Sequence, residues 1–288
     1  MPGLLIDVAL LLVVSLTAIA LFFFMLTRGA LLLRACSPAG QDASSHVYPI
    51  YSNMRLIKLV DYQFIISAIL LFQYHRLVAA IVADLRQSNL EGKTVLITSC
   101  AFGNVIPEIV GAALQAGASR ILVTDLIENE LIHAAGKLGD HGGKVEFIEA
   151  DATDLWLDSE SVDVNVMFFL LHELPHPLKQ LALDEAGRVL APGGKFYLAE
   201  FHRPDNTLLR MLGWLYFKVF EPYGLALWDT HDPIDCMNRL DDWDSERSTC
   251  CFGNYQVIRA TRLAGLCARR QRLRDTACDT ARIEAPAP

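Results

Sequence analysis

Polar side chains follow four apolar segments in the middle of the chain, and they are the residues best suited to bind a ligand. In chain order they are Ser99, Ala101 and Gly103; Asp125; Asp151 and Ala152; and His172 and Glu173. If the segments are parallel strands, their carboxyl ends meet at one edge of a sheet, where such folds bind ligands. Small residues admit a ligand to the backbone, and the Asp125 carboxylate can accept both hydroxyls of a ribose. The pattern predicts a nucleotide-like ligand, although each aspartate alone is equally typical of a helix cap.

Imidazoles and carboxylates also recur after the fourth and fifth of these predicted strands. Hard metal ions such as manganese bind both kinds of ligand, and a metal or a cationic donor can polarise a carbonyl group. The candidate metal ligands are His172, Glu200, His202 and Asp229. Single residues of these types at strand ends more often make hydrogen bonds, so both interpretations stay open.

From Lys93 onward, short apolar runs alternate with helical patterns. Strands are predicted at 95–99, 121–125, 144–150, 162–171 and 195–199, with helices at 107–116, 129–138 and 177–190. Residues 248–251 and 255–261 flank Phe252-Gly-Asn254 and predict an antiparallel hairpin. The sequence therefore predicts an α/β fold with a doubly wound, mostly parallel sheet of seven strands and helices on both faces.

The beginning of the chain has a different character, because Leu4 to Leu26 contains one charged residue, Asp7. At about 1.5 Å per residue, a helix here is long enough to cross a bilayer. A cleaved signal peptide is shorter and starts with basic residues; a buried or surface-lying helix is the other alternative. The basic residues that follow the run predict a cytoplasmic location for the rest of the chain; they are Arg28, Arg34, Arg55 and Lys58.

These patterns divide the chain into consecutive parts. They are a transmembrane helix at 4–26, a linker and N-terminal helices at 27–90, a ligand-binding domain at 91–262, and a tail at 263–288. The segment 205–245 is expected to be a lid or substrate insertion in the domain. The short apolar run from Phe64 to Phe72 cannot span a membrane, and it fits either a buried helix or an amphipathic element on a membrane surface.

Composition limits the possible partners. The 288 residues are 52% apolar and carry a formal charge of −8, with a mean hydropathy of +0.29. Because an acidic chain lacks the basic surface that neutralises phosphates, no nucleic-acid partner is expected. The apolar content excludes a disordered chain. Seven irregularly spaced cysteines do not form a small secreted disulfide framework and favour a reducing compartment.

The order of elements resembles the class I S-adenosylmethionine-dependent methyltransferase fold over residues 90–262. The most specific stretch is Glu185-Ala-Gly-Arg-Val-Leu-Ala-Pro-Gly-Gly194, which precedes a strand. The resemblance implies S-adenosylmethionine as cofactor. By position, it assigns the methionine part to Ser99, Ala101 and Gly103, the ribose to Asp125, and the adenine to Asp151 and Ala152.

Two departures from that fold family affect the methionine end of the cofactor. Ile97 stands where the family usually has an acidic residue, and Ser99 and Ala101 replace two of its usual glycines. Binding of the amino-acid end must therefore be altered, and ordinary methyl transfer becomes less certain.

A narrower likeness accommodates these departures. Four stretches together resemble the rhodoquinone-biosynthesis family: Ser99-Cys-Ala-Phe-Gly-Asn-Val-Ile-Pro107, Phe168-Phe-Leu-Leu-His-Glu-Leu-Pro175, Phe201-His-Arg-Pro204 and Phe220-Glu-Pro-Tyr-Gly-Leu-Ala-Leu-Trp228. The likeness implies conversion of ubiquinone to rhodoquinone. A ring methoxy group is replaced by an amino group, with S-adenosylmethionine as nitrogen donor and manganese assisting. The residues then expected to be catalytic are His172, Glu173, His202 and Tyr223.

The expected partners are a lipid quinone and the membrane in which it dissolves. The aromatic segment Leu208 to Trp228 is either an apolar substrate pocket or an ordinary core helix. Two alternatives to the aminating enzyme remain: a C- or O-methyltransferase of a ubiquinone or menaquinone precursor, and a membrane-anchored S-adenosylmethionine-binding protein without catalysis.

Overall fold

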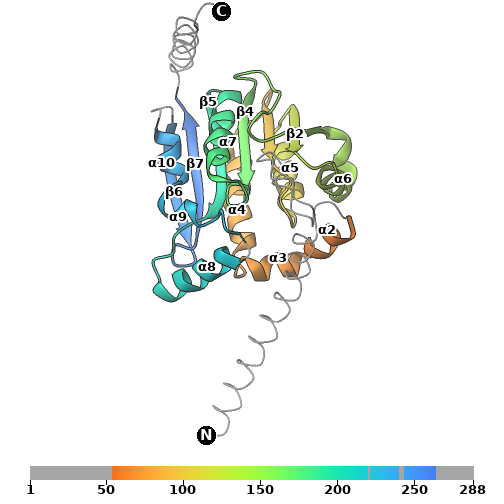
Figure 1. The fold of residues 1–288 in the computed structure, drawn as a ribbon. Coiled ribbons are helices and arrows are strands. Elements are labelled where there is room, and N and C mark those ends of the chain that lie inside the picture. The colour runs from red at the N-terminus through yellow and green to blue at the C-terminus, as the bar shows by residue number, and fades with distance from the viewer. Residues whose placement is uncertain (1–53, 220, 240–242, 264–288) are drawn as a thin grey trace, which may run out of the picture. The chain divides into compact units, whose positions relative to one another are not determined.

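The computed structural model describes residues 54–219, 221–239 and 243–263 (Figure 1). The chain divides into two units, Met1–Ile57 and Lys58–Pro288, and of the first unit only the beginning of helix α2 (Met54–Val60) is described. The predicted membrane helix at 4–26 and nearly all of the predicted tail lie outside the described residues. Within the described ranges, no helix is both long enough and apolar enough to cross a membrane.

A seven-stranded sheet with the order β3-β2-β1-β4-β5-β7-β6 forms the centre of the second unit. Its strands are β1 (Thr94–Thr98), β2 (Arg120–Asp125), β3 (Val145–Glu149), β4 (Val162–Phe168), β5 (Leu190–Phe201), β6 (Trp243–Cys250) and β7 (Tyr255–Arg262). Strands β1 to β5 are parallel, and β7 is antiparallel to β5 and to β6. The strand order reverses between β1 and β4, which is where a doubly wound sheet binds ligands. The predicted fold class and the predicted terminal hairpin are confirmed.

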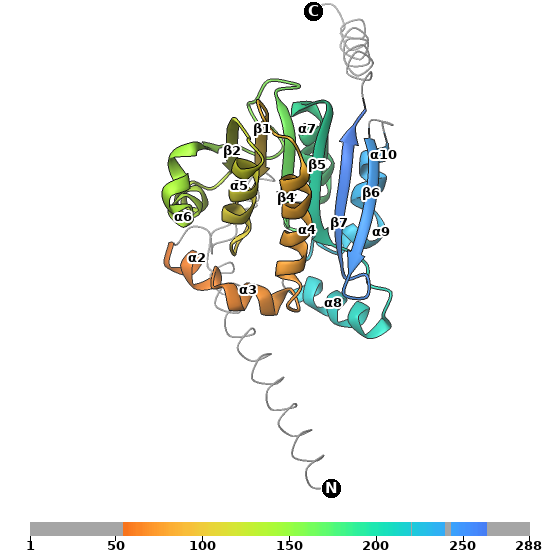
Figure 2. The same ribbon diagram turned by 180° about the vertical axis from the view of Figure 1, so that it is seen from behind.

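Helices cover both faces of this sheet. They are α3 (Gln63–Ile69), α4 (Tyr74–Gln87), α5 (Val105–Gln115), α6 (Glu128–Lys137), α7 (His176–Val189), α8 (Thr207–Val219), α9 (Ala226–Asp229) and α10 (Pro233–Asn238), with a 3₁₀ turn at Gly139–Lys144. Helices α4 and α5 lie over one face, in front in Figure 2, and α7 and α10 lie over the other, in front in Figure 1. The hydrophobic core lies between the helices and the sheet. Strand β4 is central to it, because its apolar residues are buried on both faces of the sheet.

Helices α3 and α4 precede the predicted ligand-binding domain in sequence but belong to the same compact unit. The buried residues of α4 recur at helical spacing and include Leu77, Ile81 and Leu85. The run from Phe64 to Phe72, predicted as a buried helix or as an amphipathic surface element, is buried on one side and exposed on the other. Its residue Ile66 is buried, whereas Phe64 and Phe72 are each 65% exposed.

The stretch from Glu185 to Gly194 joins α7 to β5. Local contacts at its two ends hold its conformation. The Arg188 guanidinium donates to Glu185 Oε1 at 2.6 Å and to the Leu157 carbonyl at 2.7 Å, so it ties the β3–β4 connection to α7. Gly194 has no room for a side chain, because a Cβ atom there would lie 2.8 Å from the Ala191 carbonyl oxygen and 3.1 Å from the Asp163 carbonyl oxygen.

Two glycine substitutions should therefore have opposite effects on the free energy of unfolding. Gly194→Ala should destabilise the domain by about 1–3 kcal/mol, since overpacking against backbone cannot be relieved by a rotamer change. Gly136→Ala on α6 meets nothing within 4 Å and should stabilise by about 0.5–1 kcal/mol through helix propensity. Urea unfolding of both variants checks this, and equal shifts of the same sign would refute the packing argument.

Candidate cofactor and substrate site

Asp125 lies at the carboxyl end of β2, beside the loop that follows β1. Its carboxylate accepts hydrogen bonds from the Cys100 N–H at 2.6 Å, from the Ile127 N–H at 2.9 Å and from the Ser99 hydroxyl at 3.4 Å. The residue is 9% exposed, and burial raises its pKa despite these donors. A carboxylate has about four acceptor positions, and three are used here, so about one is left for a ligand hydroxyl.

Two further buried acceptors near this loop have no hydrogen-bond partner among the described residues. They are Oε1 of Glu130, which is 3% exposed, and Oδ1 of Asn104. Burial, followed by the charge of Asp125, raises the pKa of Glu130 to about 8. Unsatisfied buried acceptors are costly, and the hydroxyls of a ribose would supply the missing donors. The residues around Asp125 therefore fit the ribose end of the predicted cofactor.

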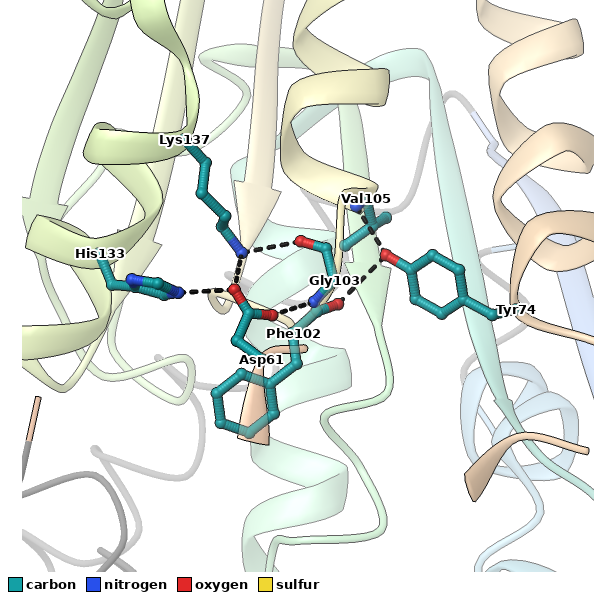
Figure 3. Close-up of polar contacts among 7 residues, drawn as sticks. All are labelled: Asp61, Tyr74, Phe102, Gly103, Val105, His133 and Lys137. Carbon is teal, nitrogen blue, oxygen red and sulfur yellow. Dashed lines mark hydrogen bonds and ion pairs between the residues drawn. The ribbon is translucent and has the colours of Figure 1, made fainter. Parts of the chain in front are cut away.

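The methionine end of the predicted site is organised differently, because side chains of the protein already hold the main chain of Gly103 (Figure 3). The Asp61 carboxylate accepts from the Gly103 N–H, and the Lys137 ammonium donates to the Gly103 carbonyl at 2.8 Å. Oδ2 of Asp61 lies 2.9 Å from Lys137 Nζ and 2.5 Å from His133 Nε2. We call Asp61, Gly103, His133 and Lys137 the Gly103 clasp.

Tyr74 fixes the other side of the same loop. Its hydroxyl donates to the Phe102 carbonyl at 3.1 Å and accepts from the Val105 N–H at 2.7 Å, at the start of α5 (Figure 3). Gly103 has a φ of +82°, and a Cβ atom there would overlap the Tyr74 ring. Ser99 also has a left-handed φ, +77°, a conformation that costs a residue with a Cβ about 1–2 kcal/mol. The loop thus keeps a glycine-like backbone at Ser99 without a glycine.

The remaining predicted cofactor residues lie at the expected edge of the sheet. Asp151 follows β3, and its Oδ1 accepts from the Thr153 N–H at 2.8 Å and from the Thr153 hydroxyl at 2.7 Å. Ala152 and Ala101 are half-buried in the loops after β3 and β1. The structure therefore brings the three predicted contact regions to one edge, while their individual roles stay predictions.

His172 and Glu200 form a buried pair after β4 and at the end of β5. His172 Nδ1 lies 3.1 Å and 3.3 Å from the two oxygens of Glu200, which is 0% exposed. Glu200 also accepts from the Phe201 N–H at 2.8 Å and from the His172 N–H at 3.2 Å. Burial alone lowers the pKa of a histidine, but the Glu200 charge and hydrogen bond raise that of His172 to about 9. The pair therefore favours the protonated imidazole, with Nε2 on the side of the ring away from Glu200.

Aromatic rings surround this pair and connect it to the cofactor loop. Phe169 and Phe201 lie 6.0 and 5.0 Å from the His172 ring, centroid to centroid. Phe168 contacts Phe169 at 5.1 Å and Tyr74 at 5.9 Å. On the other side, Phe217 of α8 packs edge-on against Phe201 at 5.0 Å. The environment of the pair is apolar, and Tyr216 and Phe217 of α8 both contact Phe201 in it.

Lys179 positions the loop that carries His172. It is 1% exposed on the inner side of α7, and its ammonium donates to the carbonyls of Leu171 and Leu174. Burial lowers the pKa of Lys179 to about 8. The side chain thus satisfies two carbonyls on either side of His172 and restrains the loop.

The four predicted metal ligands do not converge. His202 Nδ1 lies 2.7 Å from the Gly253 carbonyl and its Nε2 lies 3.1 Å from the Arg247 guanidinium, while Asp229 pairs with Arg203 at 2.8 Å. Only His172 and Glu200 contact each other. Across the part of the chain that the structure describes, no three histidine, cysteine, aspartate or glutamate residues are grouped to hold an ion. The residues do not fit the predicted manganese, and we derive no step through a metal.

The other predicted catalytic residues lie around the same edge. Tyr223 packs edge-on against His176 at 6.3 Å, and His176 stacks on His231 at 5.1 Å. Glu173 is half-buried next to His172. Both ring nitrogens of His202 already have partners, the Gly253 carbonyl and the Arg247 guanidinium. Of the four predicted catalytic residues, His202 is therefore the least suited to proton transfer.

Several site residues could not be found from the sequence. Asp61, Tyr74 and Lys137 reach Gly103 from helices or turns far away in the chain, and no local pattern marks them. Lys179 does have a signal, because it occupies the apolar stripe of α7 with Ala182, Leu183 and Ala186. A lysine on the buried face of a helix predicts a specific partner.

The family model for the ubiE/COQ5 methyltransferase family matches residues 54–231. The chain belongs to this family. A demethylmenaquinone methyltransferase of Clavibacter sepedonicus is 39% identical over 112 residues, which cover 38% of this chain and 44% of the relative. A ubiquinone/menaquinone biosynthesis C-methyltransferase UbiE of Stutzerimonas stutzeri is 27% identical over 164 residues, or 53% of this chain and 58% of the relative. The match spans about half the length of these curated relatives.

Solved structures confirm the fold. The YcgJ protein of Bacillus subtilis superposes with a TM-score of 0.51 at 12% identity, covering 66% of this chain and all of that one (100%). A candidate methyltransferase of Bacillus halodurans gives a TM-score of 0.50 at 15% identity, with 64% and 98% coverage. Family and fold together confirm the predicted methyltransferase fold, and the family supports the predicted cofactor, S-adenosylmethionine.

Breaking the Gly103 clasp should destabilise the domain. Asp61→Asn removes a carboxylate that is 5% exposed and leaves the Lys137 ammonium without its ionic partner, at a cost of about 3 kcal/mol. The melting temperature should fall by roughly 2–4 °C for each kcal/mol. Asp140→Asn, at an exposed carboxylate, is the control. A melting temperature for Asp61→Asn equal to that of the control would contradict the assigned role of the clasp.

The raised pKa of Glu130 makes stability depend on pH. The folded protein binds the proton of the Glu130 carboxyl group more tightly than the unfolded chain does. Protonated Glu130 therefore stabilises the fold fully below its ordinary pKa of 4.5, and this stabilisation is lost as pH rises toward 8. Glu130→Gln should therefore gain in melting temperature over the native protein as pH increases from 5 to 8.5. The exposed neighbour Glu128→Gln should show no such trend, and a difference independent of pH for Glu130→Gln would overturn the assignment.

Proposed function

We propose that this protein is an S-adenosylmethionine-dependent C-methyltransferase that acts on the ring of a ubiquinone or menaquinone precursor. The observation that carries the proposal is the buried His172–Glu200 pair, set among aromatic rings next to the cofactor loop of a ubiE/COQ5 family member. Relatives named for quinone methylation support the substrate class.

The protein's residues would orient and polarise the ring. When bound, S-adenosylmethionine supplies an electrophilic methyl group. Methylation of a ring carbon is faster when the neighbouring ring oxygen carries negative charge, because that charge makes the carbon nucleophilic. The His172 cation can donate its Nε2 proton in a hydrogen bond to such an oxygen, in a site where low polarity strengthens the interaction. Glu200 holds the imidazole in place and keeps it protonated.

The amination of ubiquinone to rhodoquinone is the second candidate. It is favoured by the altered cofactor loop, where Ser99 replaces a glycine and the Gly103 clasp holds the main chain at the methionine end. The same cation could polarise a quinone carbonyl beside the methoxy group that leaves. Both candidates therefore use His172 as the cationic donor.

We also propose that the protein works at the cytoplasmic surface of a membrane, with no nucleic-acid partner. The support is chemical: an isoprenoid quinone dissolves in the bilayer, and the apolar run from Leu4 to Leu26 has the length of a membrane helix.

Doubly labelled S-adenosylmethionine, with ¹³C in the methyl group and ¹⁵N in the amino group, separates the candidates. The full chain in quinone-containing vesicles should transfer ¹³C to a demethylated quinol. Transfer of ¹⁵N to ubiquinone would show that the reaction is amination and would refute the proposed methylation. Cofactor binding without transfer of either label would instead identify a binding protein without catalysis.

His172→Gln should lower kcat about 10²–10³-fold, the usual cost of losing one electrostatic donor to a developing oxyanion. Cofactor affinity measured by calorimetry should change little, since His172 follows β4 and Asp125 ends β2, with β1 between these two strands in the sheet. His176→Gln, on the neighbouring imidazole, is the matched control. If kcat survives in His172→Gln, the pair has no role in the reaction.

A further inference from the structure

Helix α8 exposes an apolar stripe on its outer side while packing apolar residues on its inner side. Leu208, Met211, Leu212 and Leu215 recur at helical spacing and are 60%, 59%, 49% and 54% exposed. On the opposite side, Phe217 is 1% exposed, and a Cβ atom at Gly213 would lie 3.0 Å from the Trp228 ring. A helix with apolar residues on two sides needs an apolar environment on both. In the described structure the outer stripe is exposed.

A second group of exposed apolar side chains surrounds α3 at the same end of the sheet. Tyr62, Phe64 and Phe72 are each 65% exposed, and the rings of Phe64 and Phe72 pack edge-on at 6.3 Å. Leu71 and Phe72 both have left-handed backbones, with φ of 49° and 59°. Such conformations are unfavourable for bulky residues. Here they turn the chain from α3 into α4 and leave both side chains in solvent.

Both helices lie at the carboxyl edge of the sheet, below it in Figures 1 and 2. Asp61, one residue before Tyr62, holds the cofactor loop, and Phe217 of α8 packs against the aromatic ring next to His172. The exposed apolar residues are thus on the outside of the two elements whose inside forms the candidate site. We call the exposed apolar residues of 62–72 and of α8 the apolar rim.

We propose that the apolar rim is the surface by which the catalytic unit rests on a lipid bilayer, so that a quinone enters the site along α8 without crossing water. The choice of substrate and the presence of a membrane rest on the proposed function, whereas the choice of this surface as the lipid contact rests on its exposed apolar residues.

Three features favour a bilayer over another protein as the occupant. The same chain carries the apolar run from Leu4 to Leu26, which has the length of a membrane helix. Trp214 is 50% exposed, with the Lys218 ammonium 5.8 Å from its ring centroid, which suits the interface between lipid tails and headgroups. Arg76 is exposed close to Phe72 in sequence and adds a cation where phosphates would lie.

The four tryptophans allow a test with the full chain. It is reconstituted in vesicles of phosphatidylcholine and phosphatidylglycerol, with or without brominated acyl chains that quench tryptophan fluorescence on contact. Trp214→Phe should remove most of the quenching. Trp156→Phe is the matched control, because Trp156 is 86% exposed and adjoins Leu155 and Leu157, which bond to the far end of α7. Quenching that is equal in both variants, or absent from the native protein, would overturn the proposal.

A second pair of variants links the rim to substrate entry. Leu212→Glu and Leu181→Glu place a charge at residues 49% and 48% exposed, on α8 and on α7. Only Leu212→Glu should reduce both quenching and turnover of a long-tailed quinone in vesicles, while turnover of a short-tailed soluble analogue is kept. Absence of turnover with every substrate would refute the proposed function and leave the quenching result to decide the rim. Self-association of the native chain without quenching would show that a second copy covers the rim, and would refute the lipid contact.

Discussion

The structure depends first on how the main chain of Gly103 is held. A negative and a positive side chain, Asp61 and Lys137, bond to its N–H and its carbonyl, and Tyr74 bonds to the residues on either side. These groups come from the N-terminal helices and from α6, so the cofactor loop, the start of α5 and the approach to the sheet are one cooperative unit.

The second determinant is a cation kept inside an apolar site. His172 remains charged because Glu200 is buried beside it and is itself satisfied by backbone donors. Rings on both sides exclude water, which makes the charge effective on a substrate oxygen. Methylation and amination of a quinone both benefit from such a donor, which is why the geometry alone supports the reaction class better than the choice between the two reactions.

Helix α8 relates the site to its surroundings. Its inner residues complete the aromatic wall near His172, and its outer residues are exposed at the same edge of the sheet. A lipid-dissolved substrate needs an apolar route as well as an apolar site, and one helix provides both surfaces. The sheet behind it is a methyltransferase scaffold shared with solved structures, and α3, α8 and the clasp border the candidate site on it.

The sequence alone determined the sheet, its hairpin and the edge at which the ligand-binding residues gather. Apolar periodicity and strand-end polarity are local signals, and Asp125, Gly103 and His172 could be selected from them. The partners of these residues were decided by the tertiary structure. Asp61 and Glu200 meet Gly103 and His172 only because distant elements pack together, and the predicted metal set failed because His202 and Asp229 found other partners. Residue type and spacing specify which side chains reach an edge, whereas packing decides which of them touch.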